Sequence, residues 1–268
     1  MRAEAEGSVR DRSASAALDT LHGRFRRNLH FAFERDGIHS TVHAHNYFSL
    51  LFPDVEIPAR LELSLYDPAG RVVAEHAERL DAHESRFVEL EPLLPAERRG
   101  RHHGTITFRI VPLVALPEAK RNANDYGSEL FVRYRDERGH HSISHSFWGV
   151  VENVFRTARW IRALPLGGTL ETSIILQSGY WGDNTLFTRY ARGTLRLTNA
   201  RGQERRFRIP PIPPRGAWIF ELAAELPDLD AFAGGDYLTA QVTGVNLYMK
   251  PLTLTRDRST GDFNIHHT

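Results

Sequence analysis

The sequence predicts an all-β protein made of two tandem antiparallel β-sandwiches preceded by a short helix. The first observation is an internal repeat, in which residues 63–70 match residues 195–202, 132 positions later. Glu89-Leu90 recurs as Glu221-Leu222 at the same shift. The second observation is the period of two in the apolar residues, as in Leu61, Leu63 and Leu65, which indicates half-buried strands. Two copies of one strand-rich domain explain both observations.

The two copies also end alike. Residues 139–146 match residues 261–268 at a shift of 122, and both segments keep a Gly, an Ile and a His at equivalent positions. The shorter shift fits a longer loop at residues 116–127 of the first copy. His145 and His267 are the histidines shared by the two copies, and we expect them to have a common structural role. Paired functional sites, one per domain, are the alternative.

The chain divides into three parts. Residues 1–37 are predicted to be a tail followed by an amphipathic helix from residue 15 to about residue 33, because Leu18, Leu21, Phe25 and Leu29 recur at helical spacing. Residues 38–163 form the first sandwich and residues 164–268 the second, both of immunoglobulin-like or related type. The segment 147–163 fits either a helix or a strand.

Turns and edges are marked by proline and glycine. Asp67-Pro68-Ala69-Gly70 is a turn sequence, since Pro presets φ and Gly accepts a left-handed backbone. Residues 210–214, Pro-Pro-Ile-Pro-Pro, are expected at the edge of a sheet, because proline cannot donate a ladder hydrogen bond.

Composition excludes several classes of protein. The 34 basic and 33 acidic side chains give a formal charge of +1, so nothing drives the whole chain toward nucleic acid or membrane. No cysteine is present, which excludes disulfides and thiolate sites. No apolar run is long enough to span a membrane, and no export signal is recognisable. We therefore expect a cytoplasmic protein.

Histidine is the side chain most suited to chemistry here, with 14 copies in clusters. His43 and His45 point to the same face of a strand, and His145 is the candidate third donor, so these three are the predicted ligands of a divalent transition metal. The His-x-His pair resembles the opening of cupin metal sites. It departs from that family where a Glu is needed, since Ser49 and Leu50 stand there. Histidines that pack or satisfy turns are the alternative.

Other catalytic signatures are absent. The sequence contains no Gly-x-Ser-x-Gly elbow, phosphate loop, dinucleotide turn or His-Glu-x-x-His helix. Carboxylates such as Glu89 and Glu91 occur, but nothing in the sequence pairs two of them at the separation that glycosidases need. We predict no catalytic residue, and the sequence favours a protein that is not an enzyme.

One loop offers a ligand site. Tyr180 and Trp181 supply aromatic faces on which a sugar ring could stack, and Asp183 and Asn184 supply hydrogen bonds. A turn whose aromatics plug the end of the sandwich is the alternative.

The function predicted from these observations is that of a non-enzymatic binding or scaffolding protein with a carbohydrate or protein partner. This rests on the fold class and on the missing catalytic signatures. A metal-dependent enzyme with a His-based site in the first domain is one alternative. A homo-oligomer that assembles through exposed strand edges is another.

Overall fold

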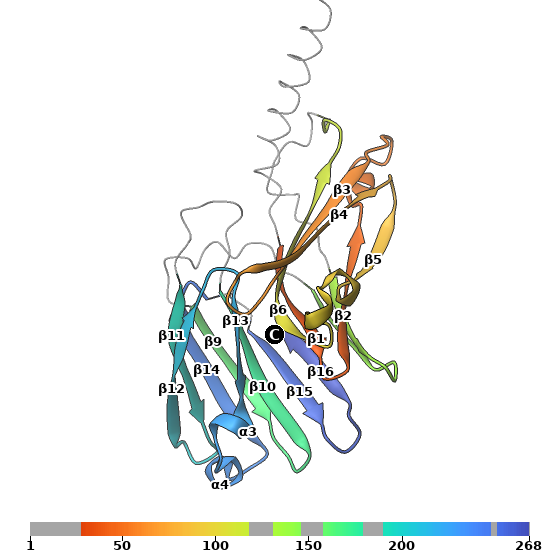
Figure 1. The fold of residues 1–268 in the computed structure, drawn as a ribbon. Coiled ribbons are helices and arrows are strands. Elements are labelled where there is room, and N and C mark those ends of the chain that lie inside the picture. The colour runs from red at the N-terminus through yellow and green to blue at the C-terminus, as the bar shows by residue number, and fades with distance from the viewer. Residues whose placement is uncertain (1–27, 118–130, 146–157, 179–189, 248–250, 268) are drawn as a thin grey trace, which may run out of the picture.

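The computed structural model describes residues 28–117, 131–145, 158–178, 190–247 and 251–267. Its elements are almost all antiparallel strands arranged in several sheets, so the all-β prediction is confirmed (Figure 1). Within these residues, no helix has the length and apolar character needed to cross a membrane.

The first half of the chain contributes eight strands, joined in one sheet in the order β4-β3-β6-β1-β2-β7-β8, with β5 paired to β2. They are β1 (Asn28–Arg35), β2 (Ile38–His45), β3 (Ala59–Tyr66), β4 (Val72–Leu80), β5 (Ser85–Glu89), β6 (Arg101–Pro112), β7 (Phe131–Asp136) and β8 (His141–His145). Its short helices are α2 (Phe48–Leu51), η1 (Glu91–Leu93) and η2 (Ala96–Arg98).

The second half contributes two four-stranded sheets, in the orders β13-β10-β15-β16 and β12-β11-β14-β9. The strands are β9 (Ala158–Pro165), β10 (Leu170–Gln177), β11 (Ala191–Thr198), β12 (Glu204–Ile212), β13 (Ala217–Glu221), β14 (Tyr237–Val245), β15 (Leu252–Asp257) and β16 (Phe263–His267). Its helices are α3 (Leu222–Glu225) and α4 (Leu229–Ala233). The prolines of β12 lie in an edge strand, as the sequence predicted.

The strands of the second half repeat the bounds and partners of the first. The strands β2, β3, β4 and β5 correspond to β10, β11, β12 and β13, with both ends of each strand shifted by 132 residues. The pairing of β6 with β1 and β3 corresponds to that of β14 with β9 and β11, and the order β5-β2-β7-β8 corresponds to β13-β10-β15-β16. In the first half, Arg35 is paired with Ile38 and links β1 to β2. This pair joins the strands β4-β3-β6-β1 to the strands β5-β2-β7-β8 in one sheet.

The sheet β13-β10-β15-β16 buries both of its faces. Ile174 and Leu176 belong to a core made of second-half residues, whereas Ile175 belongs to the larger core of the first half. Leu252 and Ile265 join Ile175 in that larger core. This sheet therefore lies between the two hydrophobic cores and connects the halves, with β15 and β16 beside the first-half strands (Figure 1). The predicted boundary at residues 163/164 falls inside β9, and the division into domains remains a prediction.

The predicted N-terminal helix is wrong over its last residues. It was expected to reach about residue 33, but residues 28–35 form β1. Leu29, Phe31 and Phe33 alternate with His30, Ala32 and Glu34, and all six are buried, so both faces of this strand are covered. Leu29 continues the helical spacing of Leu18, Leu21 and Phe25, so the helix was extended over a segment whose large apolar residues alternate as in a strand. The rest of the predicted helix, residues 15–27, lies outside the described residues.

The turn at residues 67–70 touches the second half of the chain. The carbonyl of Pro68 accepts a hydrogen bond from the backbone N–H of Ala217 at 3.3 Å. Gly70 has φ +75°, and a Cβ there would overlap the carbonyl oxygen of Pro214. The equivalent turn glycine, Gly202, has φ +76° but no neighbour within 4 Å of an added Cβ. Close approach between the halves therefore depends on Gly70 and not on Gly202.

We expect Gly70→Ala to destabilise the protein more than Gly202→Ala. The left-handed backbone costs alanine about 1 kcal/mol at either position, and the overlap with Pro214 adds about 1–3 kcal/mol at Gly70 only. Urea unfolding of the two variants measures the difference. Equal losses would mean that the contact between the halves does not constrain this turn.

Candidate functional site

The predicted metal ligands lie on the outer face of the strands β5-β2-β7-β8. His43 stands opposite Phe131 in the sheet, and Phe131 stands opposite His145. Since neighbouring strands are about 4.8 Å apart, this register separates the backbones of His43 and His145 by about 9.5 Å. The His43 ring stacks on Phe87, with centroids 4.4 Å apart. The structure therefore does not bring His43 and His145 together.

The other predicted residues are placed as follows. Nδ1 of His45 lies 2.6 Å from Oγ of Ser85. The rings of His145 and His267, the histidines shared by the two copies, meet edge to face at 4.4 Å. The predicted ligand-binding residues Tyr180, Trp181, Asp183 and Asn184 lie outside the described residues.

Aromatic and apolar side chains cover part of this outer face. Phe87, His43, Phe131 and His145 form one row across the four strands, and Arg133 and Ile143 lie in the next row. Phe87 is 60% exposed and Ile143 is 56% exposed. The guanidinium of Arg133 lies 5.4 Å from the centre of the Phe87 ring, within the range of a cation–π contact. An apolar face exposed to this extent is typical of an interaction surface.

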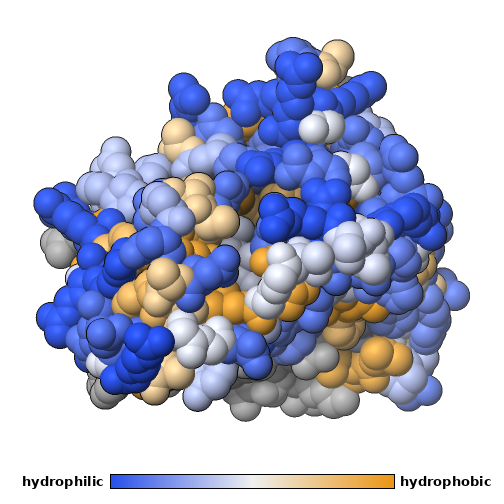
Figure 2. Space-filling model, turned by 90° about the horizontal axis from the view of Figure 1, so that it is seen from below, coloured by the Kyte–Doolittle hydropathy of each residue, from blue (hydrophilic) through white to orange (hydrophobic). Residues whose placement is uncertain are grey.

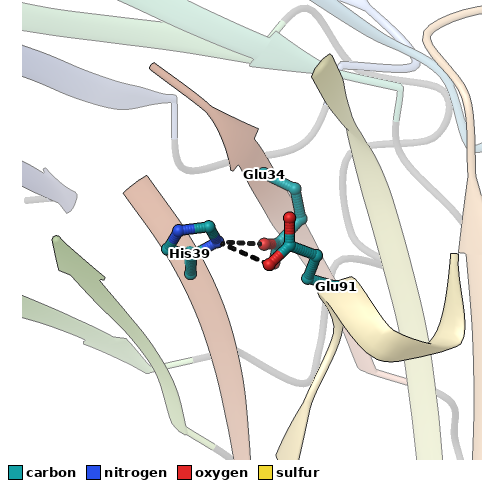
Figure 3. Close-up of side chains that lie close together, drawn as sticks. All are labelled: Glu34, His39 and Glu91. Carbon is teal, nitrogen blue, oxygen red and sulfur yellow. Dashed lines mark hydrogen bonds and ion pairs between the residues drawn. The ribbon is translucent and has the colours of Figure 1, made fainter. Parts of the chain in front are cut away.

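A cluster of Glu34, His39 and Glu91 brings together side chains from β1, β2 and η1 (Figure 3). Nδ1 of His39 lies 3.2 Å from Oε2 of Glu34 and 3.2 Å from Oε2 of Glu91. Within the described part of the chain, these three side chains form the group whose donor atoms lie close enough together to share one metal ion.

A tight turn and one strand pairing bring the three residues of this cluster together. Asp36 and Gly37 have φ of +58° and +73°, as a two-residue type I′ hairpin requires, so Glu34 and His39 lie on either side of the turn. The pair Thr41 with Glu89 joins β2 to β5, and the chain then places Glu91 at the start of η1 beside His39.

Burial dominates the electrostatics of Glu34. The side chain is fully buried, and its Oε1 accepts a hydrogen bond from the backbone N–H of Ser40 at 2.7 Å. Burial raises the pKa of Glu34 to about 8, and repulsion from Glu91 acts in the same direction, while the hydrogen bonds from Ser40 oppose it. Glu34 therefore holds a proton at neutral pH when no cation lies beside it.

An acidic pocket of about 390 Å³ adjoins His39 and Glu91. Four carboxylate side chains and one guanidinium contribute to its lining, from Glu89, Glu91, Asp136, Glu137 and Arg135. The guanidinium of Arg135 lies 3.5 Å from Glu89 and that of Arg138 lies 2.9 Å from Asp136, so the excess of negative charge around the pocket comes from Glu91 and Glu137. This electrostatic environment suits a cation better than an anion.

Sequence reasoning missed Glu34, because its position was taken as the end of a helix. The dipeptide Asp36-Gly37 between alternating residues is a strong hairpin signal that would have placed Glu34 opposite His39. Glu91 was considered only as half of a carboxylate pair, and its approach to His39 depends on the register of β2 with β5.

Comparison with models of known protein families gives no match to this chain, and a search of curated proteins also finds no match.

We expect Glu34→Gln to change the pH dependence of stability in the presence of a chelator. The raised pKa means that the folded state binds a proton which the unfolded state releases near pH 4.5. Stability from this group is therefore present at low pH and is lost as pH rises toward 8, by about 1.4 kcal/mol per pH unit at most. The amide of the variant resembles the protonated acid and does not titrate, so the variant does not lose this stability as pH rises.

Melting temperatures of the two proteins, compared at each pH from 5 to 9, measure this effect. The advantage of the variant should grow with pH and level off above about 8. A difference that stays constant with pH would show that the pKa of Glu34 is not raised. The comparison removes the contributions of other groups, such as His30 and His102, whose pKa is lowered to about 4 by burial in both proteins.

Proposed function

We propose that this chain is a non-enzymatic binding and scaffolding protein, made of two tandem copies of one β-sandwich, and that a protein partner docks on the outer face of β5-β2-β7-β8. The observation that carries the proposal is the correspondence between this exposed face and the face with which the second half packs on the first. The immunoglobulin-like type of the sandwiches remains a prediction.

The two faces have the same register. The row Phe87, His43, Phe131 and His145 in the first half corresponds to the row Ile219, Ile175, Leu252 and His267 in the second. Strand by strand, the side chains of one row have equivalents in the other. The two rows are therefore the same surface of the same unit.

Burial differs sharply between the two rows. Ile175 and Leu252 are buried in the core that they share with the first half, and Ile219 packs against it. Ile265, the counterpart of Ile143, is 0% exposed, whereas Ile143 is 56% exposed. A surface that docks within the chain in one copy is therefore exposed in the other, which supports its use for docking to another molecule.

The pockets of the two halves also correspond. A pocket of about 400 Å³ lies where Glu171, Ile219 and Leu254 of the second half meet Phe33 and Ile38 of the first. Glu171 stands 132 residues after His39. This second pocket lies beside the β1–β2 turn and α3. Figure 2 views the lower end of the molecule, and hydrophobic side chains appear there in separate areas among hydrophilic ones.

The partner we propose is a second copy of this chain, bound head to tail. Within one chain, the docking sheet of the second half packs near Phe31 and Phe33 of β1. By sheet register, Ile161 of β9 is the counterpart of Leu29, which lies on the same side of β1 as Phe31, and Ile161 is 55% exposed. The exposed face of one copy therefore has a matching apolar surface on the second half of another. Such a contact joins two different surfaces and builds rings or open chains of molecules, depending on whether the rotation between copies closes.

A carbohydrate partner has less support. The aromatic loop predicted to bind sugars lies outside the described residues, and the exposed face offers phenylalanine and isoleucine with few hydrogen-bonding groups. Apolar side chains of this kind favour contact with another protein surface.

We expect the wild-type protein to self-associate, and Phe87→Glu and Ile161→Glu each to weaken the association by at least about tenfold. A buried carboxylate without a partner opposes docking from either side. Mixing the two variants should restore association but stop it at a dimer, because each variant keeps one intact surface. Analytical ultracentrifugation measures the masses.

Leu50→Glu is the matched control, since Leu50 is an exposed apolar residue of the first half on α2. It should associate like the wild type. A wild-type protein that stays monomeric over a wide concentration range contradicts the proposal. So does a mixture of the two variants that stays monomeric, because the two intact surfaces would then fail to bind each other. Association of Ile161→Glu alone at wild-type strength would indicate a contact between two identical Phe87 faces.

A further inference from the structure

We propose that Glu34, His39 and Glu91 bind one divalent transition metal ion, with Zn²⁺ as the best match. The proposal concerns residues different from the predicted ligands His43, His45 and His145. It also stands apart from the docking proposal, because it rests on a different set of side chains and on their mutual distances.

The spacing of the donor atoms fits one shared ion. Zinc binds imidazole nitrogen and carboxylate oxygen at about 2.0–2.2 Å, so two ligands of a tetrahedral site lie about 3.3–3.6 Å apart. Nδ1 of His39 lies 3.2 Å from a carboxylate oxygen of Glu34 and 3.2 Å from one of Glu91. All three donor atoms lie within 4.8 Å of one another. Only a small adjustment of side chains would admit the ion.

The two acids converge on one nitrogen atom. Both Glu34 and Glu91 direct a carboxyl oxygen toward the same Nδ1 atom of His39 (Figure 3). That nitrogen can take part in only one strong hydrogen bond at a time, so the two acids compete for it. A metal ion bound to all three atoms would replace this shared contact and offset the negative charge of both carboxylates.

Burial and access are both suited to a metal. Glu34 is fully buried, so its carboxylate is fixed by packing and by the N–H of Ser40. The Glu91 side chain is 34% exposed and borders the acidic pocket, as does His39. The pocket provides an entry path and room for water or another ligand at the fourth position. An imidazole among the donors favours zinc over Mg²⁺ or Ca²⁺, which prefer oxygen ligands alone.

The second half of the chain lacks the same donor set. The positions equivalent to Glu34, His39 and Glu91 hold Leu166, Glu171 and Ala223. One carboxylate without a second ligand does not hold a transition metal. The proposed stoichiometry is therefore one ion per chain, although the fold is repeated.

Isothermal titration calorimetry with Zn²⁺ tests the proposal on protein that carries no histidine tag. We expect one ion per chain in the wild type. Glu91→Gln and His39→Gln should each weaken binding by more than the roughly 10–100-fold that loss of a supporting residue costs. Glu91 is partly exposed, so its variant keeps the fold, and circular dichroism confirms this. His45→Gln is the matched control on the same strand and should bind as the wild type does.

A second measurement locates the ion. Paramagnetic Mn²⁺ should broaden the NMR signals of residues around His39 and Ser40 in the wild type and leave them sharp in Glu91→Gln. Absence of Zn²⁺ binding, or equal affinity in the wild type and both ligand variants, would overturn the proposal. The titration is repeated on Phe87→Glu. If this variant no longer self-associates but binds zinc as the wild type does, the metal site is independent of the docking face.

Discussion

The sheet β13-β10-β15-β16 has to bury two apolar faces at once, and the arrangement of the whole molecule follows from this requirement. Ile174 and Leu176 point into one core while Ile175 points into the other. A strand with large apolar side chains on both faces is stable only between two layers. The sheet β12-β11-β14-β9 covers one face, so the first half of the chain has to cover the other. Contacts such as Pro68 with Ala217 then fix how the halves meet.

The same requirement explains how two similar units take different roles. Where the second half has Ile175 and Leu252 in a core, the first half has His43 and Phe131 on a surface. Histidine combines an apolar ring with polar nitrogen atoms, so His43 is compatible with both a solvated and a docked state, which Ile175 is not. The two halves differ in their side chains at this face and at the cluster around His39, whereas their strand pairing is the same.

Sequence patterns predicted what depends on local spacing and missed what depends on register. The shift of 132 and the edge position of Pro210 and Pro211 follow from residue types alone, and the structure contains both features. Strand β1 was missed because Leu29 also continues the helical spacing of Leu18, Leu21 and Phe25, which concealed the alternation of Leu29, Phe31 and Phe33. The separation of His43 from His145 could not be foreseen either, since it depends on Phe131 occupying the strand between them. Glu34 meets His39 only once β1 is recognised as a strand.

A core shared across the chain also sets the order in which folding finishes during synthesis. Phe31 and Phe33 emerge from the ribosome early, but Ile265, which belongs to the same core, is made more than 200 residues later. Part of the hydrophobic surface of the first half therefore stays exposed while the second half is translated. Such delayed burial of strands exposes a nascent chain to aggregation and makes it a client for chaperones.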